Sequence, residues 1–341
     1  MSILRVLRPG PMVSVQDRGR RGLLSMGVSA SGPMDPQSFA LANALVANDP
    51  DCAVLEFAGL GGLFELTAPA RIAVTGGSVA ITIDGRSVDP WEAHEVKAGE
   101  PIEIGMLTDA TWGYLAISGG IAVEPVLGAR ATHLRTGIGG LQGRVLQPGD
   151  ELPLGAGAHA PCLHLAKPFT RPEGPIRIVP GPQDYYFDED AWNILLSATL
   201  SISSKRDRMA MALDGAIIPS HRGHDIVSDG IAFGSIQVPG SGVPYVLTAE
   251  RQTTGGYPKI ATVASCDLPR LVQMTTGTRF TMVTVTRDEA EELLIAERRR
   301  LRAILEGIAP KPDFSFDSST LLMKNLISGV ILAEAEVQEA C

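Results

Sequence analysis

Aromatic residues are scarce in this 341-residue chain, at 5%, whereas glycine and proline are abundant, with 37 and 24 copies. So many helix-breaking residues favour a turn-rich β protein over a helix bundle. Cysteine is also rare, and the four copies form neither a C-x-x-C pair nor a spaced metal-binding set; they are Cys52, Cys162, Cys266 and Cys341. We therefore expect scattered reduced thiols, no metal in this chain and a cytoplasmic protein.

Long apolar runs and basic charge are missing too. No stretch of about 18 uninterrupted apolar residues occurs, so we expect no membrane span. Met1 to Gly10 contain no cleavage signal, so the sequence does not indicate secretion. The formal net charge is −9, whereas a nucleic-acid binder needs basic surfaces to displace phosphate counterions. We therefore expect no nucleic-acid partner.

Several well-known catalytic motifs are absent. The chain has no G-x-x-x-x-G-K-[ST] phosphate loop, no H-E-x-x-H zinc helix and no G-x-S-x-G nucleophile turn. It also has no Met-Lys-Met sequence, so we do not expect it to carry biotin itself. His221 and His224 would need a third ligand to hold a metal, and we interpret their segment as a polar surface loop.

Short apolar runs between Gly, Pro and Asp residues predict strands. Hydrophobic residues make up 45% of the chain, which is enough for a sizeable core. The residues from Val79 to Ile83 are rich in β-branched side chains and end at Asp84-Gly85, which predicts a hairpin turn. The other predicted strands are Arg71 to Val74, Tyr114 to Ile117, Ile176 to Val179, Ile260 to Val263 and Arg279 to Val285. This pattern predicts a mainly β fold with a few helices.

Two helices have clear start signals. Asp35 is a favoured N-cap and Pro36 suits the first helical position, so a helix is expected to begin there. Thr286 and Glu289 have the spacing of a capping box, which predicts a helix from Asp288 to Glu306. Apolar residues between Ser318 and Ala340 predict a last helix, which would pack on its own domain or dock on a partner protein.

A proline-rich stretch near residues 160 to 175 predicts a domain boundary. We predict an N-terminal β domain over residues 1–165, a C-terminal β domain over 174–290 and a helical extension over 291–341.

Four clusters combine tight-turn glycines with hydrogen-bonding side chains: Val15 to Arg20, Ser31 to Asp35, Gly128 to Thr132 followed by Gly139 to Arg144, and Gln252 to Pro258. Loops of this kind present backbone N–H groups to an anionic oxygen. Simpler interpretations remain open, since Asp35 can act only as a helix cap and Asp17 can form a local ion pair with Arg18 or Arg20. A turn needs glycine and proline, but it does not need Gln252, Thr253 and Thr254 as well.

The order of five motifs along the chain resembles one family. The motifs are Ser31 to Asp35, Gly119 to Ile121, Asp207 to Met209, Gly234 to Pro239 and Gln252 to Pro258. They resemble the carboxyltransferase-domain family, which includes KipA-like proteins, the C-type subunit of 5-oxoprolinase, allophanate hydrolase subunit 2 and a part of urea carboxylase. The resemblance runs from about Arg5 to about Val285. The sequence departs from the family pattern at Glu250, where the family usually has Asp.

The resemblance implies two cyclophilin-like β-barrel domains and a KipI-like partner subunit. It implies ATP-dependent opening of 5-oxoproline to glutamate, with ATP used by the assembled complex and a LamB-like subunit as a possible further partner. An alternative is transfer of a carboxyl group to urea or a related amide from carboxybiotin carried on another protein. A second alternative is a non-enzymatic antagonist of a KipI-like kinase inhibitor.

Both reactions build negative charge on an amide oxygen, which fixed donors stabilise. We therefore predict that Gln252, Thr253 and Thr254, with the amides of Gly255 and Gly256, bind the amide or oxyanion. Tyr257 is expected to pack over the ligand, and Arg130 and Arg144 to hold a carboxylate or phosphate. Asp35 or Asp17 would orient a proton or an arginine.

Overall fold

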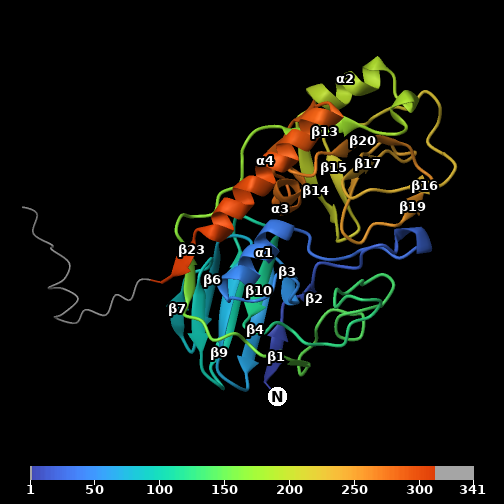
Figure 1. The fold of residues 1–341 in the computed structure, drawn as a ribbon. Coiled ribbons are helices and arrows are strands. Elements are labelled where there is room, and N and C mark those ends of the chain that lie inside the picture. Colours follow the sequence, from blue (N-terminus) through green and yellow to red (C-terminus); the bar gives the residue numbers. More distant parts are fainter. Residues whose placement is uncertain (1, 312–341) are drawn as a thin grey trace, which may run out of the picture. The chain divides into compact units, whose positions relative to one another are not determined.

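The computed structural model describes residues 2–311, and one compact unit extends from Met1 to Pro310 (Figure 1). Strands dominate it, which confirms the prediction of a mainly β protein with a few helices. The helix predicted between Ser318 and Ala340 lies outside the described residues. The domain limits near residues 165, 174 and 290 stay predictions.

The N-terminal half contains two sheets, and all of their strand pairs are antiparallel. The six-stranded sheet has the order β11 (Glu151–Pro153), β1 (Ile3–Pro9), β4 (Leu60–Leu66), β9 (Pro101–Leu107), β6 (Val79–Ile83) and β7 (Arg86–Val88). The five-stranded sheet has the order β2 (Ser14–Gln16), β3 (Val54–Ala58), β10 (Trp112–Ile117), β5 (Ala70–Thr75) and β8 (Ala93–Val96). The predicted hairpin turn joins β6 to β7, with positive φ at both Asp84 and Gly85.

The C-terminal half is built on an eight-stranded sheet. Its order is β21 (Arg279–Phe280), β14 (Leu200–Arg206), β15 (Ala210–Asp214), β18 (Tyr245–Leu247), β17 (Ser235–Gln237), β20 (Lys259–Val263), β13 (Ile176–Pro180) and β22 (Met282–Thr284). Only the β13–β22 pair is parallel in this sheet. Two small ribbons join β12 (Leu163–Leu165) to β23 (Ile308–Pro310), and β16 (Asp229–Gly230) to β19 (Thr254–Gly255).

Four α-helices and two short 3₁₀ turns complete the described part of the chain. They are α1 (Pro36–Leu45), α2 (Glu189–Ser197), α3 (Leu268–Gln273), α4 (Arg287–Glu306), η1 (Leu24–Met26) and η2 (Asp184–Tyr186). The predicted start of α1 is confirmed, since Asp35 caps it and Pro36 is its first residue. The capping box of Thr286 and Glu289 is confirmed at the start of α4. Helix α4 packs against α1 and β13, and so contacts both halves (Figure 1).

The apolar core consists of two clusters. One cluster lies between the two N-terminal sheets and includes Phe57, Phe64 and Leu115. The other joins α1 and β10 to the eight-stranded sheet, so that Phe39 and Ile236 belong to the same packed group. The two halves therefore share buried apolar surface, which is removed from water when they associate.

Among the described residues, no helix is both long and apolar enough to cross a membrane.

Candidate functional site

Two of the sequence motifs, Ser31 to Asp35 and Asp207 to Met209, meet at a buried arginine. Arg208 lies in the turn between β14 and β15, and its guanidinium forms an ion pair with Glu56 of β3. Its Nε also donates to Oε1 of Glu250 over 2.6 Å, and one terminal nitrogen donates to the carbonyl of Gly32 over 2.6 Å. Arg208, Glu56 and Glu250 are all at most 3% exposed. A cation from one half of the molecule is thus held by a carboxylate from each half.

The polar network continues from Glu56 into the N-terminal half. The Tyr114 hydroxyl donates to Glu56 over 2.9 Å and accepts from the backbone N–H of Asp35 over 2.7 Å. The Asp35 carboxylate also caps α1, and it accepts from Arg171 over 2.8 Å and from Gln273 over 2.9 Å. Asp35 is therefore fully engaged in the interior, where it acts as a helix cap and as a bridge to the C-terminal half.

Burial dominates the electrostatics of this network. Loss of water raises the pKa of Glu56, although the positive charge of Arg208 opposes the change. Burial and the nearby Glu56 charge raise the pKa of Tyr114 well above its ordinary value. Charges that have lost their water are stable only while each keeps its partner. The network therefore depends on all of its members.

A cavity of about 710 Å³ lies at the Glu250 end of the network. We call it the motif cavity, and its lining residues are Gly27, Val28, Ser29, Leu127, His133, Arg135, Thr136, Ile138, Glu250, Arg251, Gln252, Thr253 and Thr254. The predicted ligand-binding residues Gln252, Thr253 and Thr254 thus stand together on its wall. Donors fixed on one wall of a concave site are what recognition of an amide oxygen requires.

The rest of the Gln252 to Pro258 loop lies beside the motif cavity. Gly255 in β19 pairs with Asp229 of β16, and the Gly256 carbonyl accepts from the backbone of Ile226. Tyr257 is 44% exposed and is not among the lining residues. Lys259 is 1% exposed at its side chain and binds Asp229 over 2.9 Å, which lowers the pKa of that carboxyl to about 2. These contacts fix the backbone that follows Gln252, Thr253 and Thr254.

The Asp17 side chain binds backbone N–H groups of two loops. Its carboxylate accepts from the N–H groups of Gly19, Arg130 and Ala131 over 2.9, 2.5 and 3.1 Å. Arg18 forms its ion pair with Asp51, over 2.9 Å, and not with Asp17. Asp17 therefore ties two glycine-rich clusters together and is not part of the cavity lining.

The two arginines predicted to hold an anion are used elsewhere. The Arg130 side chain donates to the carbonyl of Val123 over 2.7 Å. Arg144 forms a two-pronged ion pair with Asp150, over 2.7 and 2.8 Å, which raises the pKa of Arg144 and lowers that of Asp150. Neither arginine lines the motif cavity.

Sequence reasoning missed other residues of the site. His133 lines the motif cavity, with Nδ1 3.9 Å from Oε2 of Glu250, and burial lowers the pKa of its imidazole. Its sequence neighbourhood gives no signal. Glu56 did have one, because it is a lone carboxylate inside the apolar run from Val54 to Phe57. A charge in the middle of a buried strand indicates a buried partner.

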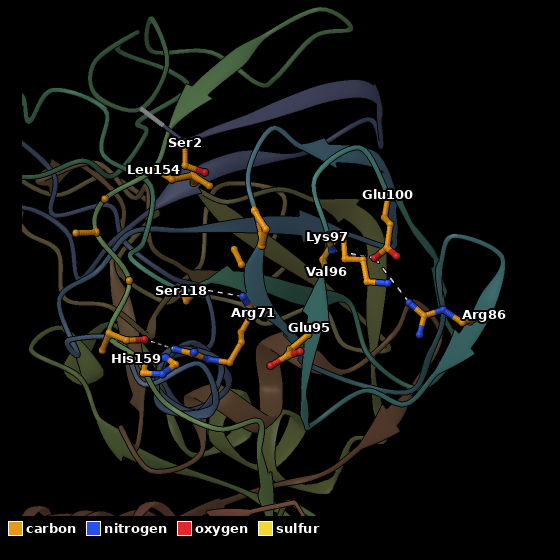
Figure 2. A pocket seen from close by; sticks show the side chains of 16 residues that line it. Ser2, Arg71, Arg86, Glu95, Val96, Lys97, Glu100, Ser118, Leu154 and His159 are labelled. Atoms are coloured by element: carbon orange, nitrogen blue, oxygen red, sulfur yellow. Dashed lines mark hydrogen bonds and ion pairs between the residues drawn. The ribbon is translucent and has the colours of Figure 1, made fainter.

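A larger cavity, of about 800 Å³, lies in the N-terminal half (Figure 2). The guanidinium of Arg71 points there toward the backbone of the 155–159 segment and donates to the carbonyls of Ala158 and Ala160 over 2.6 and 2.7 Å. At the mouth, Arg86 forms an ion pair with Glu100 over 3.7 Å. None of the five motifs lines this cavity, so we place the functional site at the smaller one.

No group of three or more His, Cys, Asp or Glu side chains within residues 2–311 is arranged to hold a metal ion. The motif cavity instead combines the neutral donors of Gln252, Thr253 and Thr254 with two arginines, Arg135 and Arg251, and with the carboxylate of Glu250.

Comparison with known proteins connects this geometry to a family. The family model for the carboxyltransferase domain, subdomains A and B, matches residues 26–284. The chain belongs to this family. The matched region contains every lining residue of the motif cavity and the whole of the Arg208 network.

Individual relatives agree with the assignment. The chain is 34% identical to the C-type subunit of 5-oxoprolinase from Escherichia coli over 289 residues, which is 84% of this chain and 93% of the relative. It is 32% identical to the same subunit from Haemophilus influenzae over 304 residues, or 86% of this chain and 94% of the relative. The solved urea amidolyase of K. lactis superimposes with a TM-score of 0.80 at 28% identity, covering 89% of this chain and 20% of that one. The predicted fold class and family resemblance are confirmed.

Proposed function

We propose that this chain is the C-type subunit of an ATP-dependent 5-oxoprolinase. The proposal rests mainly on how much of each relative this chain matches. The chain aligns with 93% and 94% of the length of the two bacterial 5-oxoprolinase subunits. The K. lactis urea amidolyase is covered over only 20% of its chain, so a stand-alone subunit is the better comparison. A KipI-like subunit and a LamB-like subunit would complete the enzyme, which we place in the cytoplasm.

In this reaction, 5-oxoproline, ATP and two waters give glutamate, ADP and phosphate. We place ATP with the assembled complex, because the motif cavity has no lysine in its lining and its one carboxylate, Glu250, is held by Arg208. When bound, ATP would supply a phosphoryl group that activates the amide oxygen. Gln252, Thr253 and Thr254 would bind and orient the lactam and stabilise charge on its oxygen, each donor lowering the barrier by about 3 kcal/mol.

The second candidate is carboxyl transfer from carboxybiotin on another protein to urea or a similar amide. Similarity to the urea amidolyase supports it. The same donors would then hold the acceptor amide, while a base removes a proton from the amide nitrogen and water is excluded.

The test of the first candidate is ATP hydrolysis by this chain co-purified with the KipI-like and LamB-like subunits. We expect glutamate and ADP to form in step when 5-oxoproline is added. Gln252→Ala should lower this turnover about 100-fold without changing the unfolding temperature, whereas Gln147→Ala, at an exposed position outside the lining, should leave it intact. Absence of 5-oxoproline-stimulated hydrolysis in the wild-type complex would reject the proposal and favour carboxyl transfer.

A further inference from the structure

The motif cavity contains an arginine that lacks a carboxylate partner. Arg251 follows Glu250 directly, is 7% exposed and lines the cavity. Its Nε donates to the carbonyl of Ile231 over 3.1 Å, and its guanidinium lies 5.8 Å from the centre of the Phe233 ring. Within residues 2–311, Arg251 forms no ion pair, and its terminal nitrogens have no hydrogen-bond partner.

Two other arginines near the cavity have counter-ions. Arg208 holds Glu56 and Glu250, and Arg135 at the rim donates to Asp207 over 2.9 Å. Glu56, Glu250 and Asp207 are therefore paired with arginines other than Arg251. Burial lowers the pKa of Arg251, but guanidinium remains charged in proteins. A buried cation without a counter-ion is costly, and an anion that enters the cavity removes the cost.

A second arginine, Arg20, contacts residues next to the lining of the motif cavity. Arg20 is 2% exposed, its Nε donates to the carbonyl of Val126 over 3.1 Å, and both terminal nitrogens are buried without a hydrogen-bond partner. Val126 and Gly139, which both contact Arg20, are direct neighbours of the lining residues Leu127 and Ile138. The negative charges of Asp17 and Glu250 act on Arg20, and loss of water still lowers its pKa. Its charge adds positive potential at the cavity.

We propose that Arg251 is the binding residue for a carboxylate group of the ligand in the motif cavity, with Arg20 as a positioning cation behind it. The fork of a guanidinium matches the two oxygens of a carboxylate. One unpaired guanidinium on the cavity wall balances one negative charge, which fits a carboxylate better than a doubly charged phosphate. Gln252, the next residue, would face the amide end of the same ligand.

This inference rests on the proposed function for the identity of the ligand. In 5-oxoproline the carboxylate is the ring substituent; in the carboxyl-transfer alternative it is the group on the ureido nitrogen of biotin. The shared chemistry is a carboxylate beside an amide-like group. Two matched ligand pairs separate these sources: 5-oxoproline against 2-pyrrolidinone, and biotinamide with a carboxymethyl group on its ureido nitrogen against biotinamide.

The experiment is calorimetric titration of the full chain, and of its complex with the partner subunits, with each ligand pair. The carboxylate member of one pair should bind wild-type protein about tenfold to a hundredfold more tightly than its neutral counterpart, as expected for a hydrogen bond to a charged group. Arg251→Gln should reduce this ratio to about one, and Arg251→Lys should keep part of it. Arg86→Gln, in the larger cavity of Figure 2, is the matched control and should keep the full ratio.

A ratio near one for both pairs on wild-type protein, or no binding of any ligand to the complex, overturns the proposal even if the Arg251 variants do not fold. A crystal structure with the preferred ligand gives a second check, because a carboxylate located away from Arg251 also overturns it. Turnover of 5-oxoproline that is unchanged in Arg251→Gln would reject the carboxylate site and leave the proposed function intact. If only the biotinamide pair shows a preference for the carboxylate member, and Arg251→Gln removes that preference, the carboxylate site is retained and the lactam reaction is rejected.

Discussion

At the scale of single residues, the glycines near the motif cavity have different structural roles. Gly128 and Gly139 both have positive φ, of 80° and 73°, in the same connecting segment after β10. A Cβ on Gly128 would meet nothing within 4 Å, whereas a Cβ on Gly139 would lie 2.1 Å from Nη2 of Arg20 and 2.1 Å from the carbonyl oxygen of Ala131. Gly139 is therefore required for close packing around Arg20, and Gly128 only for its backbone conformation.

The pair gives a prediction with a built-in control. Gly128→Ala should lower the free energy of unfolding by about 1 kcal/mol, the cost of a left-handed conformation with a side chain. Gly139→Ala carries the same backbone cost and must also displace Arg20 or Ala131, so we expect at least twice that loss. Urea unfolding of both variants measures the difference. Equal losses would show that the packing around Arg20 is loose.

At the scale of elements, the stability of α4 depends on the cap at its N-terminus, because the helix has few buried contacts. None of its 20 residues is buried, so packing contributes less to it than to α1. Its N-terminus has a complete capping box, in which Thr286 and Glu289 satisfy each other's backbone N–H groups over 3.2 and 2.7 Å. Each such contact holds a donor that the helix itself leaves unpaired.

Loss of this cap should be visible locally. Thr286→Ala is expected to cost about 1 kcal/mol, which raises amide hydrogen exchange in the first turn of α4 about fivefold. Thr286→Ser keeps the hydroxyl and should exchange at nearly the wild-type rate. Unchanged exchange in Thr286→Ala would mean that contacts with α1 and β13 alone hold the helix start.

At the scale of the whole molecule, the two halves are joined by apolar packing and by buried charge. Phe39 of α1 belongs to the same cluster as Ile236 of the eight-stranded sheet. Arg208 reaches across to Glu56, and Gln273 reaches across to Asp35 and to the backbone of Trp112. A contact surface of this kind couples the unfolding of one half to that of the other.

Arg208→Met should therefore destabilise the entire molecule. Removing one partner leaves Glu56 and Glu250 buried without a cation, and the expected loss is about 3–5 kcal/mol. Arg86→Met breaks an ion pair whose arginine side chain is 63% exposed, so it should change stability by less than about 0.5 kcal/mol. Urea unfolding followed by circular dichroism and by tryptophan fluorescence should give coincident curves for wild type. A wild-type-like midpoint for Arg208→Met would contradict the role of the network.

The local features of this protein could be predicted from neighbouring residues in the chain. The hairpin at Asp84-Gly85 and the caps at Asp35 and Thr286 follow from residues close together in the chain, and they were predicted correctly. The strand predicted from Arg279 to Val285 is instead two strands, β21 and β22, which pair with β14 and β13 across the fold. The order of the motifs predicted the family. Gln252, Thr253 and Thr254 were selected because a turn does not need such side chains, and all three line the motif cavity.

Which charged groups are available to a ligand depends on contacts made across the fold. Arg130 and Arg144 were predicted from the sequence to hold an anion, yet neither lines the motif cavity. Arg251 was not predicted; it lines the cavity, and its Nε donates to the carbonyl of Ile231 rather than to a carboxylate. The partners of an arginine can lie far away in the sequence: Glu56 is 152 positions from Arg208, and Gly32 is 176 positions from it. Whether a charge is neutralised depends on burial and on contacts made across the fold, and a local pattern of residues contains no record of either.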